Sequence, residues 1–291
     1  MHQRHYADFR LDMQFNYCAA VSVNALESAN IVGYTSYGSG ALRQPSFGAC
    51  FLPLSGASTY KLGDLVPTDF DVDNDSISII NPTTLGADAM YVYMSKEIAD
   101  AAAEADGEDP GAYDSLIGWW DAKAGGVGEE GAEAGNVDIS VGQAFLGLFD
   151  SGNDIQFQSS GDVPLTSTSI STDRERQPFF ANYLPKTITL GQIVPEDFDV
   201  DNDSISVINP ATLGADAMYV YMSKDIADAA AEADGEDPGA YDSLIGWWDA
   251  KAGGVGEEGA EAGNVSVAAG AAFLGLFDSG NDITFNFPAA L

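Results

Sequence analysis

The sequence predicts a mainly β protein with two tandem antiparallel β-sandwich domains, each carrying one short inserted helix, at about 95–106 and 223–234. The first observation behind this prediction is a repeat. Segment 69–157 returns at 197–285, and the two copies differ at nine of their 89 positions. A repeat of this length corresponds to a whole domain, because solenoid units are much shorter. The second observation is that short apolar stretches alternate with turn residues, without the strand–helix alternation of a parallel sheet.

The expected domain boundaries are 1–28, 29–158 and 159–291, and each of the two repeats is long enough to bury its own core. Residues 1–17 lack the apolar run of a signal peptide, whereas residues 18–25 have the small side chains of its cleavage region. Segment 1–28 is therefore expected to be a leader or a misassigned start.

Strands are expected in the same order in both repeats. Each repeat opens with a short strand and continues with apolar segments that end at a proline, at 30–35, 47–53 and 62–67 and again at 162–166, 179–185 and 190–195. In the near-identical block, further strands are expected at 76–80, 89–94, 116–120, 144–149 and 154–158. Met90 and Val92 alternate with Tyr91 and Tyr93, and a strand with two apolar faces belongs in the middle of a sheet.

The inserted helix is indicated by a run of good helix formers after Ser95, which is a suitable N-cap. Its apolar face is expected to consist of Ile98, Ala102 and Ala105, packed on the edge of a sheet, and the helix is expected to end at Gly107. The Ala-, Gly- and Glu-rich segment 121–136 that follows is expected to be a mobile acidic loop.

The charge of the chain restricts its partners. Forty-five acidic and eleven basic residues give a formal net charge of −34. Such a surface disfavours nucleic acid and anionic membranes and favours basic partners. Without a run of 18 apolar residues, no membrane insertion is expected. Two nearly identical β domains risk exchanging strands during folding, and repulsion between like charges opposes that exchange.

A run of alternating aspartates is the sharpest local feature, and it makes calcium the candidate cofactor. The metal-ligand candidates are Asp69, Asp71, Asp73 and Asp75, with Asp197, Asp199, Asp201 and Asp203 in the second repeat. The spacing is not that of an EF-hand, because Ser76 and Pro82 stand where that loop requires Gly and Glu. Carboxylates on one face of an extended strand lie roughly 6.5–7 Å apart, so only a turn at residues 72–74 could gather three of them. The alternative is an acidic edge that starts a turn.

A tryptophan pair in each repeat supplies the candidate ligand-binding residues, Trp119, Trp120 and Asp121 with Trp247, Trp248 and Asp249. Neighbours on a strand face opposite sides, so one tryptophan of each pair is expected in the core and the other is either exposed or covered by the helix. An exposed indole beside a carboxylate could stack on a sugar ring. The alternative is a tryptophan buried beneath the inserted helix.

Catalysis is not expected. The two histidines, His2 and His5, precede both repeats, which argues against a Ser-His-Asp arrangement or a histidine-rich zinc site in the folded domains. The glycines at 125–128 are followed by Glu129 and Glu130, which would repel phosphate. A pair of catalytic carboxylates remains an alternative, although no pair stands out.

Several short segments resemble a group of uncharacterised secreted bacterial proteins with β-rich tandem repeats. These segments are Ala-Asn-Ile-Val-Gly-Tyr (29–34), Pro-Phe-Phe-Ala (178–181), Thr-Leu-Gly-Gln-Ile (189–193), Asp-Ser-Ile-Ser (203–206), Gly-Trp-Trp-Asp (246–249) and Asp-Ile-Thr-Phe-Asn-Phe-Pro-Ala (282–289). The resemblance implies export and a β-sandwich fold, and it implies no activity.

The expected function is that of a non-enzymatic, exported structural or interaction protein that is secreted or lies at the cell surface, where a glycan or a protein would be its partner. The alternative is a carbohydrate-binding module with two equivalent, calcium-assisted sites around Trp120 and Trp248.

Overall fold

The computed structural model describes residues 32–40, 42–50, 52–53, 59–84, 86–208 and 215–290. The predicted leader 1–28 lies outside the described residues, as do the first residues of the predicted strand 30–35. No helix in the described part of the chain has the length and hydropathy needed to cross a bilayer.

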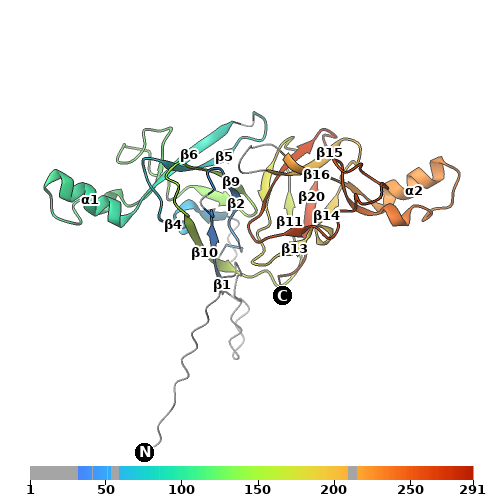
Figure 1. The fold of residues 1–291 in the computed structure, drawn as a ribbon, viewed down its shortest axis with the longest axis horizontal. Coiled ribbons are helices and arrows are strands. Elements are labelled where there is room, and N and C mark those ends of the chain that lie inside the picture. The colour runs from blue at the N-terminus through green and yellow to red at the C-terminus, as the bar shows by residue number, and fades with distance from the viewer. Residues whose placement is uncertain are drawn as a thin grey trace, which may run out of the picture.

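The chain folds into two similar, mainly β halves (Figure 1). The elements of the first half are β1 (Val32–Gly38), β2 (Ser46–Gly48), β3 (Thr59–Lys61), β4 (Val66–Thr68), β5 (Asp75–Ile80), β6 (Ala87–Met94), α1 (Lys96–Asp106), β7 (Gly118–Asp121), β8 (Asp138–Ser140), β9 (Ala144–Phe149) and β10 (Gln156–Asp162). Those of the second half are β11 (Thr168–Ser171), β12 (Phe179–Ala181), β13 (Ile188–Thr189), β14 (Val194–Glu196), β15 (Asp203–Ile208), β16 (Ala215–Met222), α2 (Lys224–Ala233), β17 (Gly246–Asp249), β18 (Ser266–Val267), β19 (Ala272–Phe277) and β20 (Thr284–Phe287).

Each half is an antiparallel sandwich. In the first half a five-stranded sheet has the order β2-β9-β5-β6-β7, a three-stranded sheet has the order β1-β10-β4, and β3 pairs with β8. The second half repeats this arrangement with β12-β19-β15-β16-β17, β11-β20-β14 and the pair β13-β18. β6 lies between β5 and β7, which confirms the central place predicted for the strand with two apolar faces.

Stacked aromatic rings join the two sheets of each half. The ring of Phe47 on β2 lies 4.6 Å from that of Phe157 on β10, and in the second half Phe180 lies 4.7 Å from Phe285. Phe70 makes edge contacts with Trp119 and Phe149 in the same core. Burial of such large rings is the main favourable contribution to this kind of core.

The inserted helix begins and ends where the sequence indicates. The hydroxyl oxygen of Ser95 accepts the backbone N–H of Ile98 at 3.2 Å, and Gly107 closes the helix in the left-handed conformation, with φ of 80°. The predicted apolar face is correct for Ile98, which packs against the cluster around Trp120, and wrong for Ala105, which is exposed; the fully buried residues of the helix are Ala99 and Ala103. The buried face is thus rotated by one residue toward Ala99, which belongs to the same buried cluster as Trp120 on the edge strand β7.

The strand predicted at 162–166 is wrong as well. β10 continues to Asp162, four residues past the expected boundary at 158, and the second half starts its own sheet only at β11. Val163 and Pro164 are buried, Val163 in the core of the second half, and Pro164 has no N–H to add to a strand ladder. The predicted strands 62–67 and 190–195 start with a 3-10 turn, so only β4 and β14 remain of them.

Candidate functional site: two equivalent acidic clefts

Each half carries one cleft between the aspartate run and the first turn of its helix. The cleft of the first half has a volume of about 630 Å³ and that of the second about 660 Å³. Residues 67–73 form one wall of the first cleft, and Ser95, Glu97, Ile98 and Asn153 complete it. Equivalent positions line the second cleft, with Glu196 in place of Thr68 and Asp225 in place of Glu97. Figure 1 places α1 and α2 at opposite ends of the molecule, so the two clefts are far apart.

The aspartate run forms the wall because it folds into a turn, as the calcium hypothesis required. The N–H groups of Asn74 and Asp75 both donate to the carbonyl oxygen of Asp71, at 3.2 and 2.8 Å. The carboxylate of Asp75 is buried, and it accepts the N–H groups of Asp71 at 2.8 Å and Ser151 at 3.1 Å. This buried carboxylate therefore ties the turn to the loop after β9.

The other carboxylates of the run differ in their hydrogen bonding and exposure. Asp71 accepts the N–H of Asp73 at 3.0 Å and the side-chain amide of Asn74 at 2.9 Å. At the equivalent Asp199, the side-chain amide of Asn202 and the N–H of Asp201 hold the pKa of the carboxyl below its usual value. Asp69 and Asp73 are exposed, and in the described structure no hydrogen bond to either carboxylate is seen.

In the described part of the chain, no basic side chain lines either cleft. Lys96 is adjacent in sequence, but its ammonium group contacts Asp100 at 3.2 Å and Asp114 at 3.0 Å on the outer side of the helix. The clefts therefore attract positive charge.

The eight metal-ligand candidates do not converge. In the part of the chain that the structure describes, no group of three or more His, Cys, Asp or Glu side chains is placed to hold a metal ion. Asp71 and Asp75 already accept hydrogen bonds from the protein, which leaves Asp69 and Asp73 as the carboxylates that face solvent. Calcium binding stays a prediction.

Both tryptophans of each pair are buried. The indole N–H of Trp119 donates to the carbonyl oxygen of Leu65 at 2.7 Å, and that of Trp120 donates to Leu116 at 2.8 Å. Trp120 is only 5% exposed, because α1 and Ala132 of the acidic loop cover it. Trp247 and Trp248 repeat these contacts. Neither ring offers an exposed face for a sugar, so stacking there would require the covering loop to move.

The acidic loop is held against the tryptophans by backbone hydrogen bonds. Ala134 donates its N–H to Trp119, and Asp121 donates its N–H to Ala132, both at 2.8 Å. The carboxylate of Asp121 accepts the N–H of Lys123 at 2.8 Å and so shapes the turn that starts the loop. Asp249 does the same with Lys251 in the second half. These two aspartates lie away from the clefts and have a structural role in the loop.

The sequence did not indicate Asn153 and Asn281 as cleft residues. The side-chain amide of Asn153 donates to the carbonyl oxygen of Asp69 at 2.9 Å, and Asn281 makes the same bond to Asp197. This bond spans 84 residues and holds Asp69 in the left-handed conformation, with φ of 60°. No local pattern could have revealed it.

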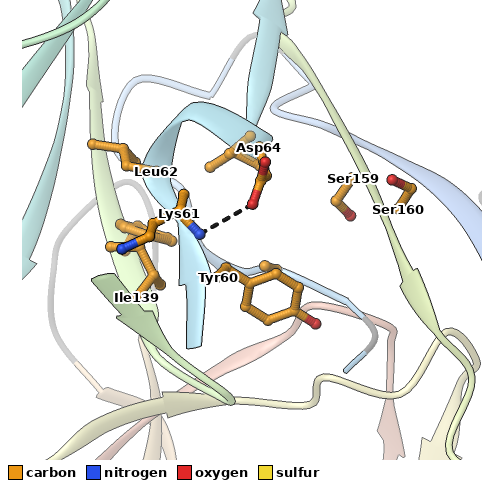
Figure 2. A pocket seen from close by; sticks show the side chains of 10 residues that line it. Tyr60, Lys61, Leu62, Asp64, Ile139, Ser159 and Ser160 are labelled. Carbon is orange, nitrogen blue, oxygen red and sulfur yellow. Dashed lines mark hydrogen bonds between the residues drawn. The ribbon is translucent and has the colours of Figure 1, made fainter. Parts of the chain in front are cut away.

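A second, much smaller cavity lies beside Tyr60 in the first half. Its volume is about 10 Å³, the size of one water molecule. Figure 2 shows Tyr60 below the turn that the Lys61 N–H closes on the Asp64 carboxylate, with Ser159 and Ser160 on a neighbouring strand. Within the described residues, the buried hydroxyl of Tyr60 has no hydrogen-bond partner. The cavity is too small and too apolar for a substrate.

No protein-family model, no curated protein and no solved structure matches the chain. The resemblance to secreted bacterial repeat proteins therefore stays a prediction, and the function has to be argued from the geometry.

Proposed function

We propose that this chain is a non-enzymatic, exported interaction protein that binds positively charged partners through its two acidic clefts, at or outside the cell surface. The observation that carries the proposal is the repetition of one acidic cleft, with three equivalent aspartates, beside the helix at each end of the molecule. Two such clefts, each beside a helix at one end of the molecule, suit a connector that holds two partners.

The charge supports a protein or peptide partner with exposed lysine and arginine. The chain carries −34 in total, and among the described residues the cleft walls hold carboxylates but no lysine or arginine. Binding of this kind is fast and sensitive to salt, because it depends on Coulomb attraction between exposed groups.

The test compares two variants that remove the same number of charges. D69N/D73N/D197N/D201N neutralises exposed cleft carboxylates that accept no protein hydrogen bond in the described structure. E129Q/E130Q/E257Q/E258Q neutralises exposed carboxylates of the two acidic loops. A fluorescent decalysine peptide is the probe, and its binding is followed by anisotropy at low and physiological salt.

The cleft variant should bind decalysine about tenfold more weakly at physiological salt, and the loop variant should bind like the unmodified protein. Equal weakening in both variants would mean that the peptide only condenses on the acidic surface, and the proposed sites would be rejected. Export is tested separately, by N-terminal sequencing of the native protein and determination of its cellular fraction. Turnover of a glycan or ester substrate that an Asp or Glu substitution abolishes would contradict the non-enzymatic role.

A further inference from the structure

The surface where the two halves meet has approximate two-fold symmetry. Phe47 on β2 forms a β-bridge with Ala271, and Phe180 on β12 forms the equivalent bridge with Gln143. Gly48 donates its N–H to the carbonyl oxygen of Gly270 at 3.0 Å, and Ala181 donates to Gly142 at 2.8 Å. β2 and β12 occupy the same edge position in their sheets, so each contact occurs twice with the halves exchanged. This is the symmetry of a homodimer interface, in which the same surface is used on both sides.

We call this surface the central interface and define it by residues 46–50 and 142–144 of the first half and 179–183 and 270–272 of the second. It is tightly packed, because Ala144, Ala181 and Ala272 are at most 4% exposed. The edge strands β2 and β12 are each covered by the other half. A third domain therefore could not pair with either strand in the same way.

Gly48 and Ala181 face each other at the centre of this interface. A Cβ atom on Gly48 would lie 2.4 Å from the Cβ of Ala181 and 3.1 Å from the carbonyl oxygen of Gln143. Two methyl carbons cannot approach to 2.4 Å, and neither can turn away, because a Cβ is fixed to the backbone. The space between the two backbones therefore accommodates one methyl group and excludes two.

Within the near-identical block, the differences between the halves cluster near the central interface. Five of the nine positions that distinguish segment 69–157 from its copy are 138–141, which precede the interface residue Gly142, and 143, which lies in the interface. Cys50 in the first half and Tyr183 in the second half also occupy equivalent positions, two residues after Gly48 and Ala181. A Cβ built on Gly270 would lie 3.7 Å from the sulfur of Cys50, and one on Gly142 would lie 3.7 Å from the ring of Tyr183. The surfaces are thus related by symmetry but complementary in shape.

We propose that the central interface is a dimer-type pairing surface with a specified partner: the first half accepts the second half, and Ala181 blocks the pairing of two second halves from different chains. In such a pair Ala181 would meet another Ala181 at the axis, which reproduces the overlap of a methyl group on Gly48. The asymmetry between glycine and alanine leaves room for the first half to pair with the second and disfavours a pair of two second halves. This inference is independent of what the clefts bind.

The test uses the folded full chain, cut between its halves. A protease site replaces the exposed linker Leu165–Ser167, and native mass spectrometry and size-exclusion chromatography follow the halves after cleavage and dilution. We expect the halves of the otherwise unmodified chain to remain a one-to-one complex without pairs of second halves. Separation into free halves, or second-half pairs at a comparable abundance, would overturn the proposal.

Exchanging Gly48 and Ala181, which face each other at the approximate two-fold axis, tests whether their side chains control the pairing. G48A should weaken the association of the halves roughly tenfold to a hundredfold, because overpacking of a rigid contact is costly. G48A/A181G should restore much of the association, since a Cβ on Gly48 lies 3.8 Å from the Cα of Ala181. A181G alone should allow pairs of second halves to appear.

G135A is the matched control, because a Cβ on Gly135 meets nothing within 4 Å. Its halves should associate as in the unmodified chain. Normal association in G48A would overturn the proposal, as would a double variant no tighter than G48A. If G48A fails to fold, the decision rests on whether A181G produces second-half pairs, and their absence counts against the proposal.

Discussion

Two buried polar side chains show how single residues stabilise this fold to different degrees. Asp75 is 2% exposed, yet both of its oxygens accept backbone N–H groups. Tyr60 is 7% exposed, and its hydroxyl has no partner within the described residues. A buried polar group stabilises a protein only when its hydrogen bonds are made, so the two side chains should respond in opposite ways to truncation.

D75A should lower the free energy of unfolding by roughly 2 kcal/mol, because it leaves the N–H groups of Asp71 and Ser151 without their acceptor. Urea unfolding monitored by circular dichroism measures the change. D73A is the control, since Asp73 is exposed and should change the stability by less than about 0.5 kcal/mol. Equal effects of the two variants would contradict a structural role for Asp75.

Y60F should raise the free energy of unfolding by up to about 1 kcal/mol, because it removes a buried hydroxyl without a hydrogen bond. Y183F should lower it by about 1 kcal/mol, since the Tyr183 hydroxyl is hydrogen bonded to Thr168. Denaturant unfolding at neutral pH distinguishes the two. A loss of stability in Y60F would mean that the hydroxyl is satisfied by a bound water.

Tyr60 also predicts that the stability of the fold decreases at alkaline pH. Burial raises the pKa of Tyr60 in the folded protein, whereas in the unfolded chain a tyrosine titrates near pH 10. The folded state therefore holds its proton longer, and stability is lost as the pH rises above about 10. The advantage of Y60F over the unmodified protein should increase between pH 9 and pH 11, and a constant difference would exclude this linkage.

Among the elements, the inserted helix has ends that are determined by local capping residues and a position that is determined by packing. Ser95 and Gly107 fix its ends through an N-cap and a left-handed C-terminal residue. Its packing is set by Trp120, which lies between the helix and the acidic loop. The helix thus covers the tryptophan and also supplies its first turn to the acidic cleft.

S95A should destabilise the first half by about 1 kcal/mol, because the N–H of Ile98 loses its acceptor at the start of the helix. Guanidinium unfolding followed by the fluorescence of the four buried tryptophans measures the change. S223A should have a similar effect in the second half, since Ser223 caps Ile226 in the same way. S169A on the exposed face of β11 should be neutral, and a comparable loss there would show that the cap has no special role.

For the whole molecule, the dominant property is its negative charge. Seven ion pairs are seen in the described structure, all of them at the surface, and in the whole sequence 45 acidic residues stand against eleven basic ones. The mutual repulsion of the acidic residues opposes the compact state and is screened by salt.

The melting temperature should rise by several degrees between about 10 mM and about 150 mM sodium chloride, as the Debye length falls from about 30 Å to about 8 Å. Differential scanning fluorimetry measures this shift. E129Q/E130Q/E257Q/E258Q should show a smaller rise, because four exposed charges are removed. A melting temperature that falls with salt would mean that ion pairs outweigh repulsion.

The sequence by itself determined the repeat, the mainly β class, most of the strands and both ends of the helix, because periodicity and capping depend on neighbouring residues. It also located the aspartate runs that line the clefts. Only the tertiary structure decided the rotated face of the helix, the burial of Trp120 and the role of Asn153, which bonds to Asp69 across 84 residues. The contact of Gly48 with Ala181 belongs to the same group. Such contacts depend on how distant segments fill space together, and no local pattern encodes that.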